Sequence, residues 1–567
     1  MSSTHYTSLL AWATARGAVW STALEVRDTG PRGRGVFSAG AGLKKGDVIL
    51  RLPLSLAVRP SGHLRELCAE NKITNVMALA LIIVHELFAD ASSRDPFFEL
   101  LAASASPAVP LLWDRSTLHL LHGTALMGPT ASLPSAALGG AGAKPGGGPP
   151  SNVAGADAAL AAAREAFATD VLPAMALAGE EYLPTHVRTM RHFETALAWV
   201  TSRGLQGRLN YEVGCAGMWP YLRTDGPPSG VGPFMLPLFD LINHASDPSE
   251  RCTHLERPTG EDGEPAPYME MRADRDVPVG EEVLHCYGAQ GAAELLRTYG
   301  FSEPSPLSKI TVTQAELLVA AAEESVAAAA ARGGGGGEGD GASSVDGGGE
   351  SKSDSNPDSS SSSSSSSGSG ADGGGGGSGA NLKKRLMLGQ GFPPAFTVRA
   401  STGSSSTTKM PTAGAPPVIP VELLTAVQVL VMGEEELEEW SECGFISLGE
   451  DFLDEDSLPR VVSFFFKLAE VCQRRYECPR EAVSEDTASV GSSAATAADP
   501  VMLAEAAAFV DVLKKEEIKL MRGLRMAALS LQCPEESDED GEEEDGEEED
   551  GEDAIAGSGH KDKKRKT

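Results

Sequence analysis

Apolar and polar positions follow two different periods along this chain. Residues 24–56 contain short apolar runs between glycines, which predicts strands joined by turns, and residues 47–53 form a strand that ends at a proline. Residues 61–205 instead show mainly helical patterning. Residues 268–272 alternate again like a half-buried strand, and residues 292–299 predict a short helix. The pattern therefore predicts an α+β protein.

The helical stretch contains individual elements that the pattern resolves. Residues 75–88 are strongly apolar with a narrow polar face, which predicts a largely buried helix. Further helices are predicted near 157–172, where Pro173 should end the helix, and near 186–201. Residues 127–155 are rich in Gly, Ala and Pro, so we expect a flexible insertion there.

Helical periodicity returns in the C-terminal part of the chain, from about Leu307. Helices are predicted at 421–431, 458–476 and 501–531. The segment 332–380 is Gly- and Ser-rich with scattered acids, so its composition predicts a disordered loop that cannot form a packed core. In the last helix the apolar residues predicted to face the core are Leu503, Ala507, Val510, Leu513, Ile518 and Met521.

The net charge of the chain limits the classes of binding partner that we expect. The formal net charge is −33 over 567 residues, and residues 535–553 supply fifteen acids and no base. The remainder is still acidic, which disfavours broad binding to the nucleic-acid backbone. It favours a protein substrate with a basic face, and we expect no nucleic acid, no membrane and a monomer.

The eight cysteines form no C-x-x-C pair, so neither a zinc site nor a disulfide framework is predicted. Reduced thiols are typical of an intracellular protein. The strongest apolar run, 76–84, is about half of the roughly 18 residues that a membrane span needs. No charged segment followed by an apolar core marks a secretory signal at the N-terminus.

The compartment stays open between cytoplasm and nucleus. The basic tail 561–566 fits a nuclear-localisation patch and a solvated chain end equally well. The first 23 residues contain Arg16 and no acid, so a chloroplast transit peptide is not excluded, although Trp12 and Trp20 argue against it.

Four short motifs occur in a fixed order: Gly33-x-Gly35, Asp240-x-x-Asn243-His244, Glu281-Glu282-Val283 leading to Tyr287-Gly288, and Tyr299-Gly300-Phe301. Each is weak alone, because a Tyr-Gly pair is usually a turn and an Asn-His pair is usually a hydrogen-bonded loop. In this order and spacing, they resemble the SET-domain methyltransferases. The closest branch contains the Rubisco large-subunit lysine methyltransferase and its non-histone relatives.

The resemblance implies a domain organisation. A SET β-fold of short sheets at 20–301 would be split by a helical insertion at about 61–205, and an all-α substrate-binding domain would follow at 307–531. The tail 535–567 would be disordered. Many histone-directed SET enzymes carry a cysteine-rich zinc cluster after the SET core, and its absence here favours the non-histone branch.

The resemblance also implies S-adenosylmethionine as cofactor and assigns roles to residues. Methyl transfer needs a neutral nitrogen aligned with the donor methyl, and a tyrosine hydroxyl can orient that amine without being consumed. The catalytic residue would be Tyr287. Arg203 would contact the methionine carboxylate, and Tyr299 would border the adenine pocket, although a surface arginine at a helix C-terminus and a core aromatic remain the plain alternatives. The cofactor-binding residues would be Arg32, Gly33, Arg34, Arg203, Asp240, Asn243, His244 and Tyr299, with no metal.

Three functions remain open at this stage. The main prediction is a protein-lysine N-methyltransferase that acts on a non-histone protein. The alternatives are a protein-histidine N-methyltransferase and a catalytically inactive SET module that serves as a protein-binding scaffold. Many relatives carry a Ser-Asn pair where this chain has Gly291-Ala292, and a basic residue where it has Gln290. Both departures lie near the acceptor side, so the substrate is expected to differ.

Overall fold

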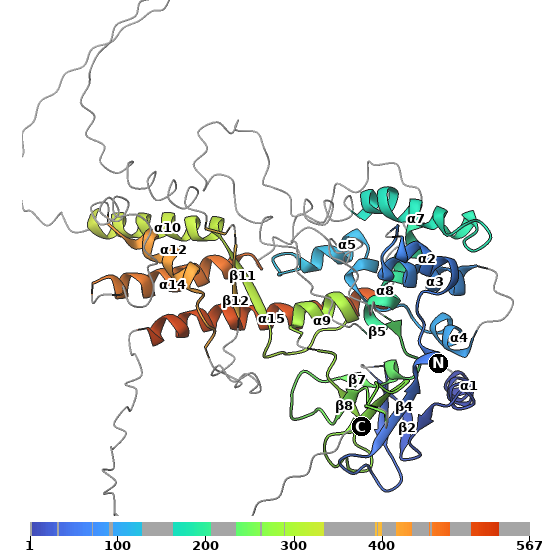
Figure 1. Cartoon of the computed structure of the whole chain (residues 1–567). Helices are drawn as coiled ribbons and strands as arrows, with labels where there is room; N and C mark the ends of the chain where they lie inside the picture. Colours follow the sequence, from blue (N-terminus) through green and yellow to red (C-terminus); the bar gives the residue numbers. More distant parts are fainter. Residues whose placement is uncertain are drawn as a thin grey trace, which may run out of the picture.

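The computed structural model gives the protein a mixed α and β architecture, which confirms the predicted α+β class (Figure 1). Four predicted features lie outside the described residues: the stretch 127–155, residues 334–380 of the stretch predicted at 332–380, the tail 535–567 and the candidate residue Arg32. Residues 332–333 of the second stretch belong to a helix. The described residues are 3–30, 33–70, 72–89, 95–126, 163–205, 234–260, 263–288, 290–333, 392–393, 395–399, 416–433, 453, 456–476 and 500–531.

A four-stranded antiparallel sheet joins the two ends of the predicted SET region. Its strands, in the order β1-β4-β9-β8, are Val19–Trp20, Val48–Pro53, Tyr268–Ala273 and Thr253–Glu256. The strand β4 pairs with β9, so that Leu50 lies opposite Met271, more than two hundred residues later in the chain. The chain between β4 and β8 therefore leaves the sheet and returns to it, as the predicted insertion requires.

The other strands of this region are short and pair two by two. The hairpin of β2 (Leu24–Gly30) and β3 (Gly33–Ser38) confirms the predicted strands before residue 56. The strand β5 (Gly204–Leu205) pairs with β6 (Phe234–Met235). A parallel pair is formed by β7 (Asn243–His244) and β10 (Leu284–His285).

Helices cover the sheet region. They are α1 (Ser3–Thr14), α2 (Gly62–Ala69), α3 (Asn75–Phe88), α4 (Pro96–Ala103), α5 (Arg115–Leu118), α7 (Leu172–Leu177), α8 (Met190–Arg203) and α9 (Ala292–Tyr299). Short 3₁₀ turns occur at Leu54–Leu56, Pro110–Leu112, His119–Leu121, Thr185–Val187 and Phe239–Leu241. The bounds of α3 and α9 agree with the predicted helices.

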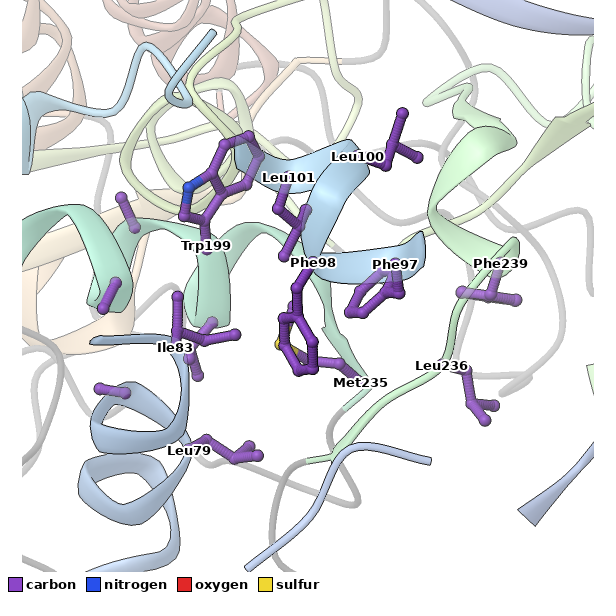
Figure 2. Packing of buried hydrophobic residues seen from close by; sticks show 14 of the residues in the cluster. Leu79, Ile83, Phe97, Phe98, Leu100, Leu101, Trp199, Met235, Leu236 and Phe239 are labelled. Carbon is purple, nitrogen blue, oxygen red and sulfur yellow. The ribbon is translucent and has the colours of Figure 1, made fainter. Parts of the chain in front are cut away.

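The main core lies where α3, α4 and α8 meet the sheet region. Thr74 caps α3 by accepting a hydrogen bond from the backbone N–H of Met77, and eight of the helix's residues are buried. Figure 2 shows Leu79, Ile83 and Trp199 in this core, together with Phe98. The almost wholly apolar α3 is stable because neighbours cover most of its circumference.

The prediction that Pro173 ends its helix is wrong. The helix α7 runs from Leu172 to Leu177 and contains Pro173 in its first turn. A π-helical turn, Phe167–Val171, precedes it. Because the wider turn shifts the hydrogen-bonding pattern there, the missing N–H and the ring of proline are accommodated within a continuous helical segment.

The C-terminal part is mainly helical, but the expectation of an all-α domain is incomplete. Its helices are α10 (Gln314–Gly333), α12 (Val421–Val431), α14 (Ser457–Arg474) and α15 (Pro500–Ser530). The strand β11 (Lys309–Thr313) also pairs antiparallel with β12 (Ala395–Arg399). Ile310 and Val312 alternate with polar residues and are fully buried, so β11 has the period of a half-buried strand.

The long helix α15 joins the two parts of the molecule, as its course in Figure 1 shows. Its N-terminal half packs Val510 against Trp113 and Leu296, which belong to the SET-like part. Its C-terminal half packs Met521 and Leu524 with α14 and α12. Helix α15 therefore connects the C-terminal helices to α9, which follows the predicted catalytic tyrosine.

The register predicted for α15 is wrong at several positions. Leu503 is 37% exposed and Ala507 is exposed, whereas Ala506 and the acidic Glu517 are buried. The Glu517 carboxylate accepts hydrogen bonds from the backbone N–H of Ala125 (2.9 Å) and the Tyr476 hydroxyl (2.6 Å). The burial of Glu517 could not be predicted from the sequence, because a buried carboxylate is unfavourable unless it is hydrogen-bonded, and its partners lie far away in the chain.

None of the helices in the described part of the chain combines the length and the hydrophobicity that crossing a bilayer requires.

Candidate active site

The parallel pairing of β7 and β10 brings together two motifs that lie forty residues apart in sequence. Asn243 is opposite Leu284, and His244 is opposite His285. The strand β10 ends at His285, and Tyr287 follows on irregular backbone. Tyr287 therefore lies beside the Asn243-His244 pair.

Two hydrogen bonds fix Tyr287 to this pair. Its backbone N–H donates to Nδ1 of His244 at 3.0 Å, and its hydroxyl donates to the carbonyl oxygen of Ile242 at 2.7 Å. Because Nδ1 accepts, the neutral imidazole carries its proton on Nε2, which faces the Ser246 hydroxyl at 3.1 Å. Burial raises the pKa of the Tyr287 hydroxyl above its ordinary value, so the hydroxyl stays neutral at physiological pH.

Aromatic rings surround Tyr287. The centroid of its ring lies 4.8 Å from that of Tyr299 and 5.1 Å from that of His244. The Tyr299 hydroxyl also donates to the Tyr287 carbonyl at 3.3 Å. Phe301 completes the group, with its ring centroid 6.0 Å from that of His244. The predicted Tyr299 thus contacts the predicted catalytic residue directly.

Gly300 sets the direction of the chain between Tyr299 and Phe301. It ends α9 in the left-handed region, with φ of +82°. A Cβ atom there would lie 2.8 Å from the backbone of Ala108, so the position has no room for a side chain. The Tyr-Gly-Phe motif therefore requires glycine both for its backbone conformation and for close packing.

Asn243 connects three segments through its side-chain amide. Nδ2 donates to the backbone carbonyl of Arg34 at 2.7 Å and to Oε1 of Glu282 at 2.8 Å. Arg34 belongs to β3, and Glu282 lies just before β10. The sequence motif contains Glu282 but predicts no role for it, although the acidic pair before Val283 is the available signal.

Asp240 and two arginines form a charged cluster next to these motifs. Nε of Arg203 lies 3.0 Å from Oδ2 of Asp240, and Nη2 of Arg34 lies 3.9 Å from the same oxygen. The Asp240 side chain is only 3% exposed and each arginine side chain is 18% exposed. Arg203 is therefore a largely buried residue of this cluster, unlike the surface arginine of the plain alternative.

In this cluster two guanidinium groups face the Asp240 carboxylate. Burial lowers the pKa of Arg203, and the neighbouring Asp240 carboxylate opposes that effect. The Arg203 guanidinium also lies over the Trp199 ring, 4.1 Å from its centroid. Oδ1 of Asp240 is buried and has no hydrogen-bond partner among the described residues. The arrangement suits a small zwitterion that brings both a carboxylate and an ammonium group.

The remaining predicted residues are Gly33 and Arg32. Gly33 begins β3 with φ of +76°, and a Cβ atom there would meet no described atom within 4 Å. Arg32 lies outside the described residues. Among the described residues, no group of three or more His, Cys, Asp or Glu side chains could hold a metal ion.

Known proteins resemble this chain in sequence. The N-lysine methyltransferase SETD6 of Mus musculus is 24% identical over 271 residues, which are 47% of this chain and 47% of that protein. Its namesake from Rattus norvegicus is 24% identical over 323 residues, 56% of this chain and 57% of that protein. The chain is similar to SET-domain lysine methyltransferases. It spans about half the length of the curated relatives that it matches.

Solved SET-domain structures align along most of the chain at low identity. The SET domain of LSMT with lysine and AdoHcy gives a TM-score of 0.47 and 14% identity, covering 93% of this chain and 92% of that chain. Rubisco LSMT with AdoMet gives a TM-score of 0.45 and 13% identity, covering 93% of each chain. No family model matches the chain.

Proposed function

We propose that this protein is an S-adenosylmethionine-dependent protein-lysine N-methyltransferase that acts on a non-histone protein. The observation that carries the proposal is the position of Tyr287. Its hydroxyl donates to the Ile242 carbonyl, and its backbone N–H donates to the His244 ring. Asp240 of the charged cluster lies in the same segment of the chain as Ile242 and His244. The names of the similar proteins, which are N-lysine methyltransferases, support the same activity.

The charged cluster fits the amino-acid end of the cofactor. Arg203 and Arg34 would hold the carboxylate, and Oδ1 of Asp240 would accept a hydrogen bond from the ammonium group. S-Adenosylmethionine, when bound, supplies a methyl group on a positively charged sulfur. Asn243 and His244 would line the path toward the adenosine end, where Tyr299 would border the base.

Tyr287 would orient the acceptor nitrogen. Its hydroxyl proton points to the Ile242 carbonyl, which leaves oxygen lone pairs free to accept a hydrogen bond from an amine. Because burial keeps the hydroxyl neutral, it would contribute a fixed dipole and no charge that varies with pH. The nearby rings of Tyr299, His244 and Phe301 would favour the uncharged form of a lysine by excluding water.

The acceptor protein would bind between the SET-like part and the C-terminal helices. The packing of α15 on α9 brings those helices next to the segment that carries Tyr299. The non-histone assignment depends on the absence of a cysteine-rich cluster after Phe301 in the sequence.

Titration calorimetry with S-adenosylmethionine tests the proposal, combined with transfer of a labelled methyl group to protein in a cell extract. The proposal predicts saturable binding and labelled protein. Binding without transfer to any protein would instead support a scaffold, and absence of binding would refute the cofactor assignment.

A further inference from the structure

The N-terminal helix α1 reaches the charged cluster through Tyr6. Nη1 of Arg34 donates a 2.5 Å hydrogen bond to the Tyr6 hydroxyl. The Arg34 guanidinium carbon also lies 5.0 Å from the centroid of the Tyr6 ring. Tyr6 comes before the start predicted for the SET region at residue 20, and sequence reasoning assigned it no role.

The helix that carries Tyr6 is firmly anchored. Leu9 and Ala13 are fully buried in the main core, and α1 packs against α4 and β1. Tyr6 itself is partly buried and packs against the same core. The hydroxyl is therefore presented to Arg34 from a fixed element.

Arg34 is held at both ends. Its backbone carbonyl accepts the 2.7 Å hydrogen bond from Asn243, and its side chain lies between Tyr6 and Asp240. The 3.9 Å between Nη2 and Oδ2 of Asp240 is too long for a hydrogen bond, whereas Arg203 makes a 3.0 Å bond to that oxygen. The hydrogen bond to Tyr6 is therefore the closer of these two contacts of the Arg34 side chain.

We propose that Tyr6 is a positioning residue that keeps the Arg34 guanidinium turned toward the carboxylate of the cofactor's methionine end. This inference rests on the proposed function and extends it to α1. Loss of the Tyr6 hydroxyl would remove the hydrogen bond that fixes the direction of the Arg34 fork, so that the guanidinium would turn toward Asp240 and away from the carboxylate.

Two ligands separate this role from a merely structural one. S-Adenosylhomocysteine carries the amino-acid carboxylate, and 5′-methylthioadenosine keeps the adenosine and the thioether but lacks the amino-acid group. In Tyr6→Phe, which removes only the hydroxyl, the Kd for S-adenosylhomocysteine should rise about tenfold, the size expected for one hydrogen bond to a charged group. The Kd for 5′-methylthioadenosine should change less than about twofold, since a packed ring remains.

The control is Tyr268→Phe. Tyr268 lies on β9, and the guanidinium carbon of Arg51 lies 4.8 Å from the centroid of its ring. This variant removes the hydroxyl from a tyrosine whose ring also lies against an arginine but that we do not place in the cluster, so both Kd values should match the parent's.

A double-mutant cycle keeps the test decisive if 5′-methylthioadenosine binds too weakly to measure. In the Arg34→Met background, Tyr6→Phe should have no further effect on S-adenosylhomocysteine binding. Equal weakening of both ligands, an unchanged Kd for S-adenosylhomocysteine, or full additivity of the two substitutions would overturn the role of Tyr6. A parent protein that binds neither ligand would instead refute the proposed function itself.

Discussion

The hydroxyl of Tyr287 donates a 2.7 Å hydrogen bond to the backbone carbonyl of Ile242, the residue before Asn243. This bond joins the segment after β10 to the segment that carries Asp240 and the strand β7 with its Asn243-His244 pair. It also fixes the direction of the hydroxyl, so that its lone pairs are available for an acceptor amine. The proposed chemistry depends on that fixed orientation.

Tyr287→Phe removes the hydroxyl and keeps the ring contacts with His244 and Tyr299. We expect kcat to fall by about 10²-fold, because the hydroxyl acts on the transition state more than on ground-state binding. The Kd for S-adenosylmethionine, measured by calorimetry, should stay within about twofold of the parent value. Tyr299→Phe is the control, since it removes the neighbouring hydroxyl that donates to the Tyr287 carbonyl at 3.3 Å, and its loss of kcat should be much smaller. Near-normal turnover in Tyr287→Phe would remove the residue from the mechanism.

Asn243→Ala leaves the Arg34 carbonyl and the Glu282 carboxylate without their shared donor. Each buried group that loses a partner costs about 1–3 kcal/mol, so we expect a lower melting temperature and weaker S-adenosylmethionine binding. Asn75→Ala, at the first residue of α3, serves as a control outside the site and should leave cofactor binding unchanged. If Asn243→Ala bound the cofactor as the parent does, the cofactor site would have to lie elsewhere.

His244→Ala removes the acceptor of the Tyr287 backbone N–H and the ring beside Phe301. We expect weaker cofactor binding, together with a loss of stability of about 1–3 kcal/mol in a urea titration. His254→Ala offers a control on β8, where the imidazole is half exposed, and should be close to neutral in both measurements. Parent-like values for both quantities in His244→Ala would contradict the assigned role.

Gly300→Ala tests the backbone between Tyr299 and Phe301. Gly263 is its matched control, because it has nearly the same φ (+83° against +82°) and its Cβ would meet no described atom within 4 Å. Left-handed strain alone should make Gly263→Ala cost about 1 kcal/mol. The clash with the Ala108 backbone should add about 1–3 kcal/mol in Gly300→Ala, measured by thermal unfolding. Equal costs at the two positions would show that the tight packing at Gly300 is absent.

Glu517 should make the stability of the C-terminal helices depend on pH. Burial raises its pKa from 4.5 to about 7, against opposing effects of Arg475, Tyr476, the Ala125 N–H and Lys514. The folded state therefore binds a proton more tightly than the unfolded state between those two values. The free energy of unfolding therefore falls as pH rises from about 4.5 to about 7, and this contribution is constant above pH 7. The total fall is roughly 1.4 kcal/mol for each unit of difference between the folded and unfolded pKa values.

Glu517→Gln isolates this effect. The amide keeps a hydrogen-bonding group beside Ala125 and Tyr476 but does not titrate, so the difference in unfolding free energy between parent and variant should change across that pH window. The control is Glu194→Gln, because burial also raises the pKa of Glu194 to about 7. Glu194→Gln should remove a separate part of the pH dependence of the unfolding free energy, and the effects of the two substitutions should add. A parent–variant difference that is the same at pH 5 and pH 8 would contradict the account of Glu517.

Long periodic elements could be predicted from the sequence, and contacts between distant elements could not. The apolar run at 75–88 and the helix at 292–299 match α3 and α9, because local periodicity alone determines them. The ordered motifs identified Tyr287, Asn243 and His244 as neighbours before any geometry was known.

The missed features all depend on partners far away in sequence. The strands β7 and β10 have two residues each, too few to show a period. The partner of β11 comes some eighty residues later. Tyr6 and Glu517 are polar residues on helices, and their significance comes only from Arg34 and Tyr476, which tertiary packing brings to them.

The pH profile of methyl transfer separates lysine from histidine as the acceptor. A lysine amine has a pKa near 10.4 when free, so the rate of the chemical step should rise with pH well past neutrality. A histidine acceptor is mostly neutral above about pH 6.5, so its profile would flatten near there. The control is Tyr287→Phe, which should keep the shape of the profile at a much lower rate.

Residue-level mapping of the methyl group tests the central claim most directly. The protein is incubated with a cell extract and labelled S-adenosylmethionine, and the modified proteins are mapped by mass spectrometry, with Tyr287→Phe as the parallel reaction. We predict methyl groups on lysine Nζ of a non-histone protein, formed by the parent and nearly absent with the variant. Methyl groups found only on an imidazole nitrogen, or equal labelling by parent and variant, would contradict the account.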